Sequence, residues 1–263
     1  MVLSRFWALG LGLSVMLFTL AGCASGDGII KQANAGAPEG TGMSKRMMQR
    51  GDRTRMYGLF IPVNYSPDKK WPVIVFLHGV GEGGSNASDN LTVGLGPVIA
   101  KSPKTFPFIA IFPQSASGRW PADSEQAEDI VTILDSVSKS YNVDQDRVIL
   151  TGLSTGGYGT WTIGAKYRDR FAALVPMCAY SSEEDIPKLT QMPIWAFHNS
   201  ADPFVLSSAT EDMVAGINRQ GGRARMTLYS AMGHDCWIRA YGDPELYQWM
   251  LAQRRNLKPM AVK

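Results

Sequence analysis

The sequence has few of the residues that build a metal centre or a disulfide scaffold. Three cysteines and three histidines occur in 263 residues, with no CxxC pair and no histidine-rich tract. So few cysteines cannot form a stabilising disulfide framework, and no metal-binding motif is present. We therefore expect neither a metal nor another cofactor.

The sequence also lacks a strong charge of either sign. Twenty-six Lys and Arg residues face 23 Asp and Glu residues, for a net charge of +3, and no five like charges are consecutive. This balance excludes the basic surface typical of nucleic-acid-binding proteins. With 45% hydrophobic residues, and with glycine and proline together at about 16%, the chain is neither disordered nor fibrous. We expect a globular protein without a nucleic-acid partner.

The N-terminus reads as an export signal. Residues 6–22 carry no charge and follow Arg5, which predicts a signal peptide over residues 1–22. Leu20-Ala21-Gly22-Cys23 resembles the bacterial lipobox, which implies a lipid anchor on Cys23 that attaches the protein to a membrane of the bacterial cell envelope. Ala24 after the cysteine implies the outer membrane, on its periplasmic or outer face. An ordinary signal or an anchor helix is the alternative, although 17 residues are short for a membrane span.

Residues 23–42 are small, polar and glycine-rich, and this composition predicts a flexible tether. Residues 43–263 form one domain, in which strands and helices alternate. An antiparallel hairpin is expected over 43–62, followed by short apolar runs typical of strands buried on both faces. These runs cover residues 72–77, 108–112, 147–153, 172–177, 194–197 and 225–229, and helical patterns cover 125–141, 156–168, 207–219 and 243–254. The alternation predicts an α/β fold with a mostly parallel central sheet and helices on both faces.

A candidate nucleophile lies between a strand and a helix. Gly152-Leu-Ser154-Thr-Gly156 follows the strand at 147–153 and opens a helical pattern. The G-x-S-x-G pattern alone is weak, but this context suits a nucleophile elbow that exposes a serine above the sheet. A plain glycine-rich turn is the alternative.

A base and an acid follow in the chain order that such sites require. His234 comes after the last expected strand, and Asp202 follows the strand at 194–197. An imidazole can take the proton of the serine, and a carboxylate can orient that imidazole. His198 is expected to pack beneath the acid loop, and Asp235 to point away from the base.

Two backbone N–H groups are expected to stabilise a developing oxyanion. One belongs to Thr155, next to the serine, and the other to Val80, in the glycine-rich run His78-Gly-Val-Gly-Glu-Gly-Gly84. Phosphate binding by this run is the alternative, but the Lys-Ser/Thr end of a P-loop is absent.

Five segments together resemble one family: WPVIVFLHGVGEGG, TGLSTGGYGTW, DRFAALVPMC, IWAFHNSADPFV and GHDCWIRAYGDPELYQWML. They are similar to the α/β-hydrolase group of bacterial esterases, variously described as phospholipase/carboxylesterase, feruloyl esterase-like or prolyl oligopeptidase-like hydrolases. The resemblance covers about residues 55–253 and implies an α/β-hydrolase fold. It places Ser154, Asp202 and His234 on the triad and Val80 and Thr155 on the oxyanion hole. The chain departs from the family at Thr155, where methionine is frequent, and at Cys236, where serine is frequent.

Three further residues have two interpretations each. Cys178 and Cys236 either form a disulfide that braces the His234 loop or remain two buried thiols. Trp120 either stacks on a substrate in the pocket or packs in the interior.

Taken together, these features predict a serine hydrolase that cleaves carboxylic esters through an acyl-enzyme, with a small-molecule or polymer-borne ester as substrate. A serine peptidase of prolyl oligopeptidase type is one alternative. A binding lipoprotein with a vestigial triad is another.

Overall fold

The computed structural model describes residues 25–255. The expected signal peptide, residues 1–22, and the expected lipidation site, Cys23, lie outside the described residues. Within residues 25–255, every helix is too short or too polar to cross a lipid bilayer.

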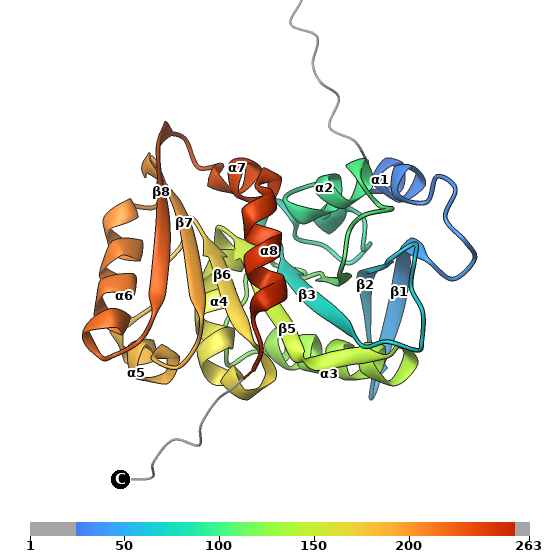
Figure 1. The fold of residues 1–263 in the computed structure, drawn as a ribbon, viewed down its shortest axis with the longest axis horizontal. Coiled ribbons are helices and arrows are strands. Elements are labelled where there is room, and N and C mark those ends of the chain that lie inside the picture. Colours follow the sequence, from blue (N-terminus) through green and yellow to red (C-terminus); the bar gives the residue numbers. More distant parts are fainter. Residues whose placement is uncertain (1–24, 256–263) are drawn as a thin grey trace, which may run out of the picture.

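An eight-stranded sheet runs through the described residues (Figure 1). Its strands are β1 (Gly42–Arg50), β2 (Arg53–Ile61), β3 (Trp71–Leu77), β4 (Ile109–Pro113), β5 (Val143–Leu153), β6 (Ala173–Met177), β7 (Ile194–Ala201) and β8 (Ala224–Met232). They lie in the order β1-β2-β4-β3-β5-β6-β7-β8. β2 pairs antiparallel with β1 and β4, and all other neighbours are parallel. The predicted mostly parallel sheet and the N-terminal hairpin are confirmed.

Helices cover both faces of the sheet. One face is covered by α1 (Gly26–Ala33), α2 (Leu95–Lys101), α7 (Cys236–Gly242) and α8 (Pro244–Ala252). The other is covered by α3 (Glu125–Ser140), α4 (Thr155–Lys166), α5 (Ile186–Leu189) and α6 (Ser207–Arg219). Each layer encloses its own hydrophobic core, as an α/β fold requires.

The central strand β3 shows why its sequence is apolar throughout. All seven of its residues are buried. Val73 and Val75 pack into the core beneath α3 and α4, whereas Ile74 and Phe76 pack into the core beneath α2 and α7. Successive strand side chains point to opposite faces, so a strand covered on both sides has no polar position.

The predicted flexible tether is wrong over part of its length, because residues 26–33 form helix α1. Ser25 caps this helix by accepting a hydrogen bond from the N–H of Gly28 at 3.2 Å. Ile29 and Ala33 lie one helical turn apart and are buried against the core. A salt bridge from Lys45 to Asp27, 2.8 Å long, also holds the helix to β1. Small residues here permit close packing: a Cβ on Gly26 would lie 2.3 Å from the Ser88 carbonyl oxygen.

Candidate active site

Ser154 occupies a sharp turn between β5 and α4. Its φ and ψ angles are 54° and −119°, a left-handed backbone conformation that is rare for a residue with a side chain. Glycine is required on both sides: a Cβ on Gly152 would lie 2.4 Å from the carbonyl oxygen of Gly156, and one on Gly156 would lie 2.1 Å from that of Leu77. The strand–turn–helix context predicted for a nucleophile elbow is therefore present.

His234 contacts Ser154 directly. It lies in the loop between β8 and α7, at the top of Figure 1. Its Nε2 is 2.9 Å from the Oγ of Ser154, within hydrogen-bonding distance. The rings of Phe204 and Trp237 pack edge-on against the imidazole, each with its centroid 5.6 Å away. These rings restrict the position of the imidazole, whose side chain is 15% exposed.

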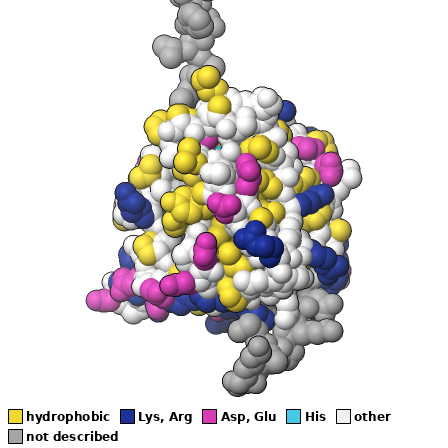
Figure 2. Space-filling view, turned by 90° about the vertical axis from the view of Figure 1, so that its left-hand side faces the viewer, with side chains coloured by type: hydrophobic (Ala, Val, Ile, Leu, Met, Phe, Trp, Pro, Cys, Tyr) yellow, Lys and Arg dark blue, Asp and Glu magenta, His cyan; other side chains and the backbone are white. Residues whose placement is uncertain are grey.

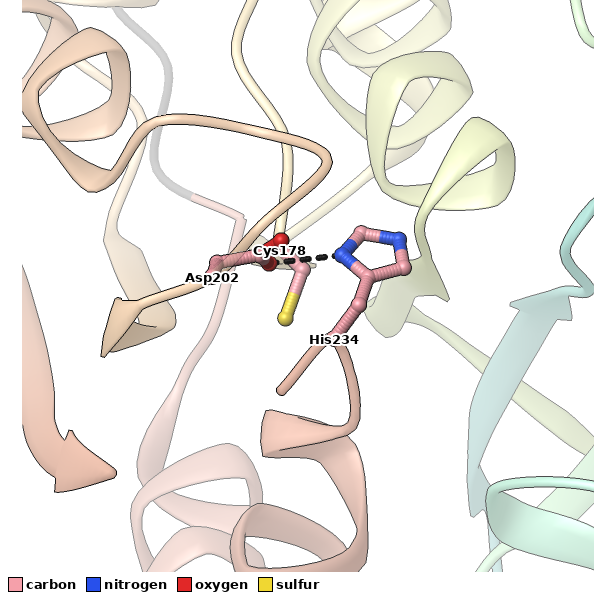
Figure 3. Close-up of side chains that lie close together, drawn as sticks. All are labelled: Cys178, Asp202 and His234. Atoms are coloured by element: carbon pink, nitrogen blue, oxygen red, sulfur yellow. Dashed lines mark hydrogen bonds and ion pairs between the residues drawn. The ribbon is translucent and has the colours of Figure 1, made fainter. Parts of the chain in front are cut away.

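Asp202 accepts a hydrogen bond from the other nitrogen of the same imidazole. Its Oδ2 is 2.6 Å from His234 Nδ1, and Figure 3 shows the carboxylate pointing at the ring. Its Oδ1 accepts hydrogen bonds from the N–H groups of Phe204 and Val205, at 2.9 and 3.1 Å. Burial acts to raise the pKa of Asp202, but the bonds from His234 and the two N–H groups outweigh it and lower this pKa. The side chain is therefore a carboxylate at neutral pH, oriented by the imidazole and by two backbone N–H groups.

His198 and Asp235 are the other base and acid candidates, and of these His198 also approaches Asp202, with its Nε2 3.3 Å from Oδ2. His198 is buried beneath the acid loop, with Nδ1 2.8 Å from the Thr210 hydroxyl and Nε2 2.9 Å from the Val205 carbonyl oxygen. Burial lowers its pKa. Asp235 accepts a hydrogen bond from the side chain of Asn199 at 2.9 Å. Both positions agree with the sequence-based interpretation.

The two expected oxyanion donors begin neighbouring helical segments. Val80 is the first residue of η1 (Val80–Glu82), which follows β3, and Thr155 is the first residue of α4. β3 pairs with β5 up to Leu77 and Gly152, so these segments leave adjacent strands. The first N–H groups of a helix have no partner within that helix and can bind an anion. The turn before Val80 is fixed by Glu82, whose carboxylate accepts the Gly79 N–H at 3.0 Å.

The side chain of Thr155 has a contact that sequence reasoning missed. Its hydroxyl donates to the carbonyl oxygen of Gly118 at 2.6 Å. Gly118, at φ 66°, lies so close to the other oxyanion segment that a Cβ on it would be 2.5 Å from the Val80 carbonyl oxygen. Thr155 thus ties the nucleophile helix, the loop at 115–119 and Val80 together. The methionine frequent in the resembling family has no hydroxyl to make this bond.

Trp120 is an interior residue. It is 4% exposed, and its indole N–H donates to the carbonyl oxygen of His78 at 2.9 Å. The His78 ring in turn accepts the Ser115 N–H at Nε2 and lies 2.7 Å from the Gly79 oxygen at Nδ1. Burial lowers the pKa of His78 to about 4, so this ring is neutral at pH 7. The packing alternative for Trp120 is therefore favoured over direct stacking on substrate, and its structural role is to hold the oxyanion loop.

Cys178 and Cys236 form a disulfide, with Cα atoms 6.6 Å apart. The bond joins the end of β6 to the start of α7, next to His234. Figure 3 shows Cys178 beside Asp202 and His234, with donor atoms of the three residues within 4.8 Å of one another. A disulfide sulfur is not the thiolate that a metal ion binds, and Asp202 and His234 already bond each other. This donor set therefore does not fit a metal.

Hydrophobic side chains gather around the site. Figure 2 shows them in the upper half of the face formed by β8 and α6. Phe204, in the loop after β7, and Met232, the last residue of β8, are 80% and 82% exposed. Exposed apolar residues of this size beside a concave site are typical of a surface that meets a ligand.

Comparisons with known proteins agree with this fold. Residues 112–183 match the prolyl oligopeptidase family. The crystal structure of a thermostable esterase superposes with a TM-score of 0.75 at 28% identity, over 81% of this chain and 63% of that one. The bifunctional acetylxylan esterase/xylanase XynS20E of Neocallimastix patriciarum is 27% identical over 143 residues, or 53% of this chain. Poly(3-hydroxyalkanoate) depolymerase C of Paucimonas lemoignei is 29% identical over 119 residues, or 40% of this chain.

The sheet order, the elbow and these similarities define the class: the chain has the α/β-hydrolase fold. The proteins reported above as similar to the chain are a thermostable esterase, a bifunctional acetylxylan esterase/xylanase and a poly(3-hydroxyalkanoate) depolymerase. The chain spans 20% and 27% of the length of the two named enzymes from Neocallimastix and Paucimonas.

Proposed function

We propose that the protein hydrolyses carboxylic esters through an acyl-enzyme formed on Ser154. The observation that carries this proposal is the continuous chain of hydrogen bonds from Ser154 through His234 to Asp202, at 2.9 and 2.6 Å. A serine hydroxyl is a poor nucleophile until an oriented base takes its proton, and this arrangement supplies such a base.

The proposed reaction has two steps, formation of the acyl-enzyme and its hydrolysis. The Ser154 Oγ attacks the ester carbonyl carbon while its proton moves to His234 Nε2, and the carbonyl oxygen becomes an oxyanion facing the N–H groups of Val80 and Thr155. The intermediate collapses, the C–O bond to the alcohol breaks, and His234 gives its proton to the leaving oxygen. Water then loses a proton to His234 and attacks the acyl carbon, which releases the acid and restores Ser154. Asp202 stabilises the imidazolium in both steps.

The test is hydrolysis of p-nitrophenyl acetate, butyrate and octanoate and of methyl ferulate by the wild type and by Ser154→Ala. We expect the variant to lose at least about 10⁴-fold in kcat. Ser140→Ala, on the exposed end of α3, serves as the matched control and should retain full activity. If the folded wild type cleaves no ester, or if Ser154→Ala retains turnover, the proposal is wrong.

A peptidase is the second candidate, because the matched family is that of prolyl oligopeptidase. The same nucleophile and base can attack an amide, whose leaving amine needs the proton from His234. Succinyl-Ala-Pro-p-nitroanilide, assayed beside the esters, separates the two activities. We expect the ester to be cleaved with the higher kcat/KM.

We also propose that the protein is exported and lipid-anchored through Cys23 at the outer membrane. Only the sequence of residues 1–24 supports this. Because α1 begins at Gly26 and packs against the domain, such an anchor would hold the domain close to the membrane surface. α1 and the loop that carries His234 lie at the same end of the molecule in Figure 1, so this end would face the lipid.

The anchor is tested by Cys23→Ser in a bacterial host. We expect the wild type to partition into Triton X-114 and to sediment with outer membranes, and the variant to stay in the aqueous phase. Labelling with radioactive palmitate should mark the wild type alone. Equal partitioning of the two proteins would argue for an uncleaved anchor helix or an ordinary signal.

A further inference from the structure

A large groove begins beside the nucleophile and follows helix α4. Thr155, Tyr158, Thr162 and Lys166 line it, and they recur at the three- and four-residue spacing of one helix face. The loop at 119–123 forms the facing wall. From Thr155 to Lys166 the helix rises about 16 Å, at 1.5 Å per residue. The groove therefore extends well beyond the reacting bond.

Its volume is larger than a small ester needs. The cavity measures about 1250 Å³, whereas pockets for drug-sized ligands usually hold about 300–1,000 Å³. A groove of this length and volume fits a chain of several linked units. The position of Thr155 at its inner end would place one unit of such a chain at Ser154.

The charges along the groove balance. Four basic and four acidic side chains line it, and several are held in pairs on its walls. Lys166 binds Asp123 at 2.9 Å, and Lys188 binds Asp185 at 2.9 Å. A balanced wall offers both hydrogen-bond donors and acceptors but attracts neither anions nor cations as a whole. This favours an uncharged chain that carries many hydroxyl groups.

Tyr158 lines the groove near its inner end, and Tyr180 packs against Tyr158 beside the groove. Tyr158 and Tyr180 are 41% and 38% exposed and pack edge-to-face, with ring centroids 5.1 Å apart. Each offers an apolar ring and a hydroxyl, a combination suited to a sugar ring with an apolar face and polar edges. A polyester chain, by contrast, has no hydrogen-bond donors and cannot use the acceptors that line the wall.

From these features we propose that the groove along α4 binds the sugar chain of an esterified, uncharged polysaccharide and presents its ester to Ser154. The proposal rests on the esterase function proposed above. Binding of remote sugar units then positions the ester, so the groove should matter for a long substrate and not for a small one.

The test narrows the groove at its middle with Thr162→Trp. Thr132→Trp is the matched control: Thr132 lies on α3 outside the groove, and both hydroxyls donate to the carbonyl oxygen four residues earlier, at 3.2 and 3.0 Å. Substrates are acetylated xylotetraose, p-nitrophenyl acetate and a poly(3-hydroxybutyrate) film. We expect Thr162→Trp to lower kcat/KM on the oligosaccharide by about tenfold or more relative to p-nitrophenyl acetate, as loss of remote binding does, and Thr132→Trp to leave this ratio unchanged.

A second measurement is independent of turnover. Unesterified xylotetraose should bind Ser154→Ala in calorimetry, and adding Thr162→Trp should abolish that binding. Equal losses on both soluble substrates, or no loss on the oligosaccharide, would overturn the proposal, and a selective loss on the film would assign the groove to a polyester. If the wild type binds xylotetraose but cleaves no ester, the esterase function fails while the binding groove stands.

Discussion

Replacing Asp202 with asparagine is expected to lower kcat on p-nitrophenyl acetate by on the order of 10⁴-fold while leaving the fold intact. The carboxylate accepts the Nδ1–H of His234 at 2.6 Å, which leaves Nε2 free of its proton and facing Ser154. An amide can offer its NH₂ group to Nδ1 instead, which favours the tautomer with the proton on Nε2. That imidazole cannot take the proton of the serine.

Asp235→Asn is the matched control for this substitution. Asp235 is next to His234 in the chain, but its carboxylate accepts a bond from Asn199, and an asparagine oxygen can accept the same bond. Circular dichroism and thermal unfolding should show both variants folded. The assignment of Asp202 is wrong if the two variants lose similar activity, or if Asp202→Asn keeps more than about a tenth of kcat, which is far above the loss expected for a wrong tautomer.

The sequence alone indicated Ser154, Asp202 and His234 as candidates because each residue comes at or just after the end of a strand. β5, β7 and β8 run parallel, so their carboxyl ends meet at one edge of the sheet. Any polar residue that follows such a strand is brought to this edge, whatever its distance along the chain. The helical periodicity over residues 125–141 and 207–219 was likewise strong enough to locate α3 and α6.

Features that depend on close approach between distant segments could not be predicted. Helix α1 is short and rich in small residues, so composition favoured a tether, and its stability comes from burying Ile29 and Ala33 against α2 and β1. The bond from Thr155 to Gly118 spans 37 residues. The groove along α4 needs the loop at 119–123 opposite the helix, and no sequence pattern gives the distance between them.

The pairing of the two cysteines also could not be predicted from the sequence. They are 58 residues apart in the chain, and spacing alone left a disulfide and two free thiols equally open. The deciding fact is the position of α7 against the end of β7, where the Cys236 sulfur lies 3.4 Å from the Phe197 carbonyl oxygen. There it reaches Cys178, which follows the neighbouring strand β6.

Replacing both cysteines with alanine is expected to lower the free energy of unfolding by about 4 kcal/mol, because the bond closes a long loop and so restricts the unfolded chain. For a chain of this size, such a loss lowers Tm by on the order of 10 °C. The loop between β8 and α7 carries His234 and is fixed at one end by Cys236, so it should be the first active-site element to loosen on heating. Activity of the double variant should therefore fall at a lower temperature than activity of the wild type.

Differential scanning calorimetry with and without a reducing agent provides the measurement and its control. Reduction should bring the Tm of the wild type close to that of the double variant and should leave the double variant unchanged. Both sulfurs are buried, at 1% exposure each, so reduction should require partial unfolding and proceed slowly at 25 °C. Two results would together contradict this prediction: the reductant leaves the Tm of the wild type unchanged even after incubation near that Tm, and both cysteines titrate as free thiols. They would mean that Cys178 and Cys236 act as small apolar side chains without a covalent bond.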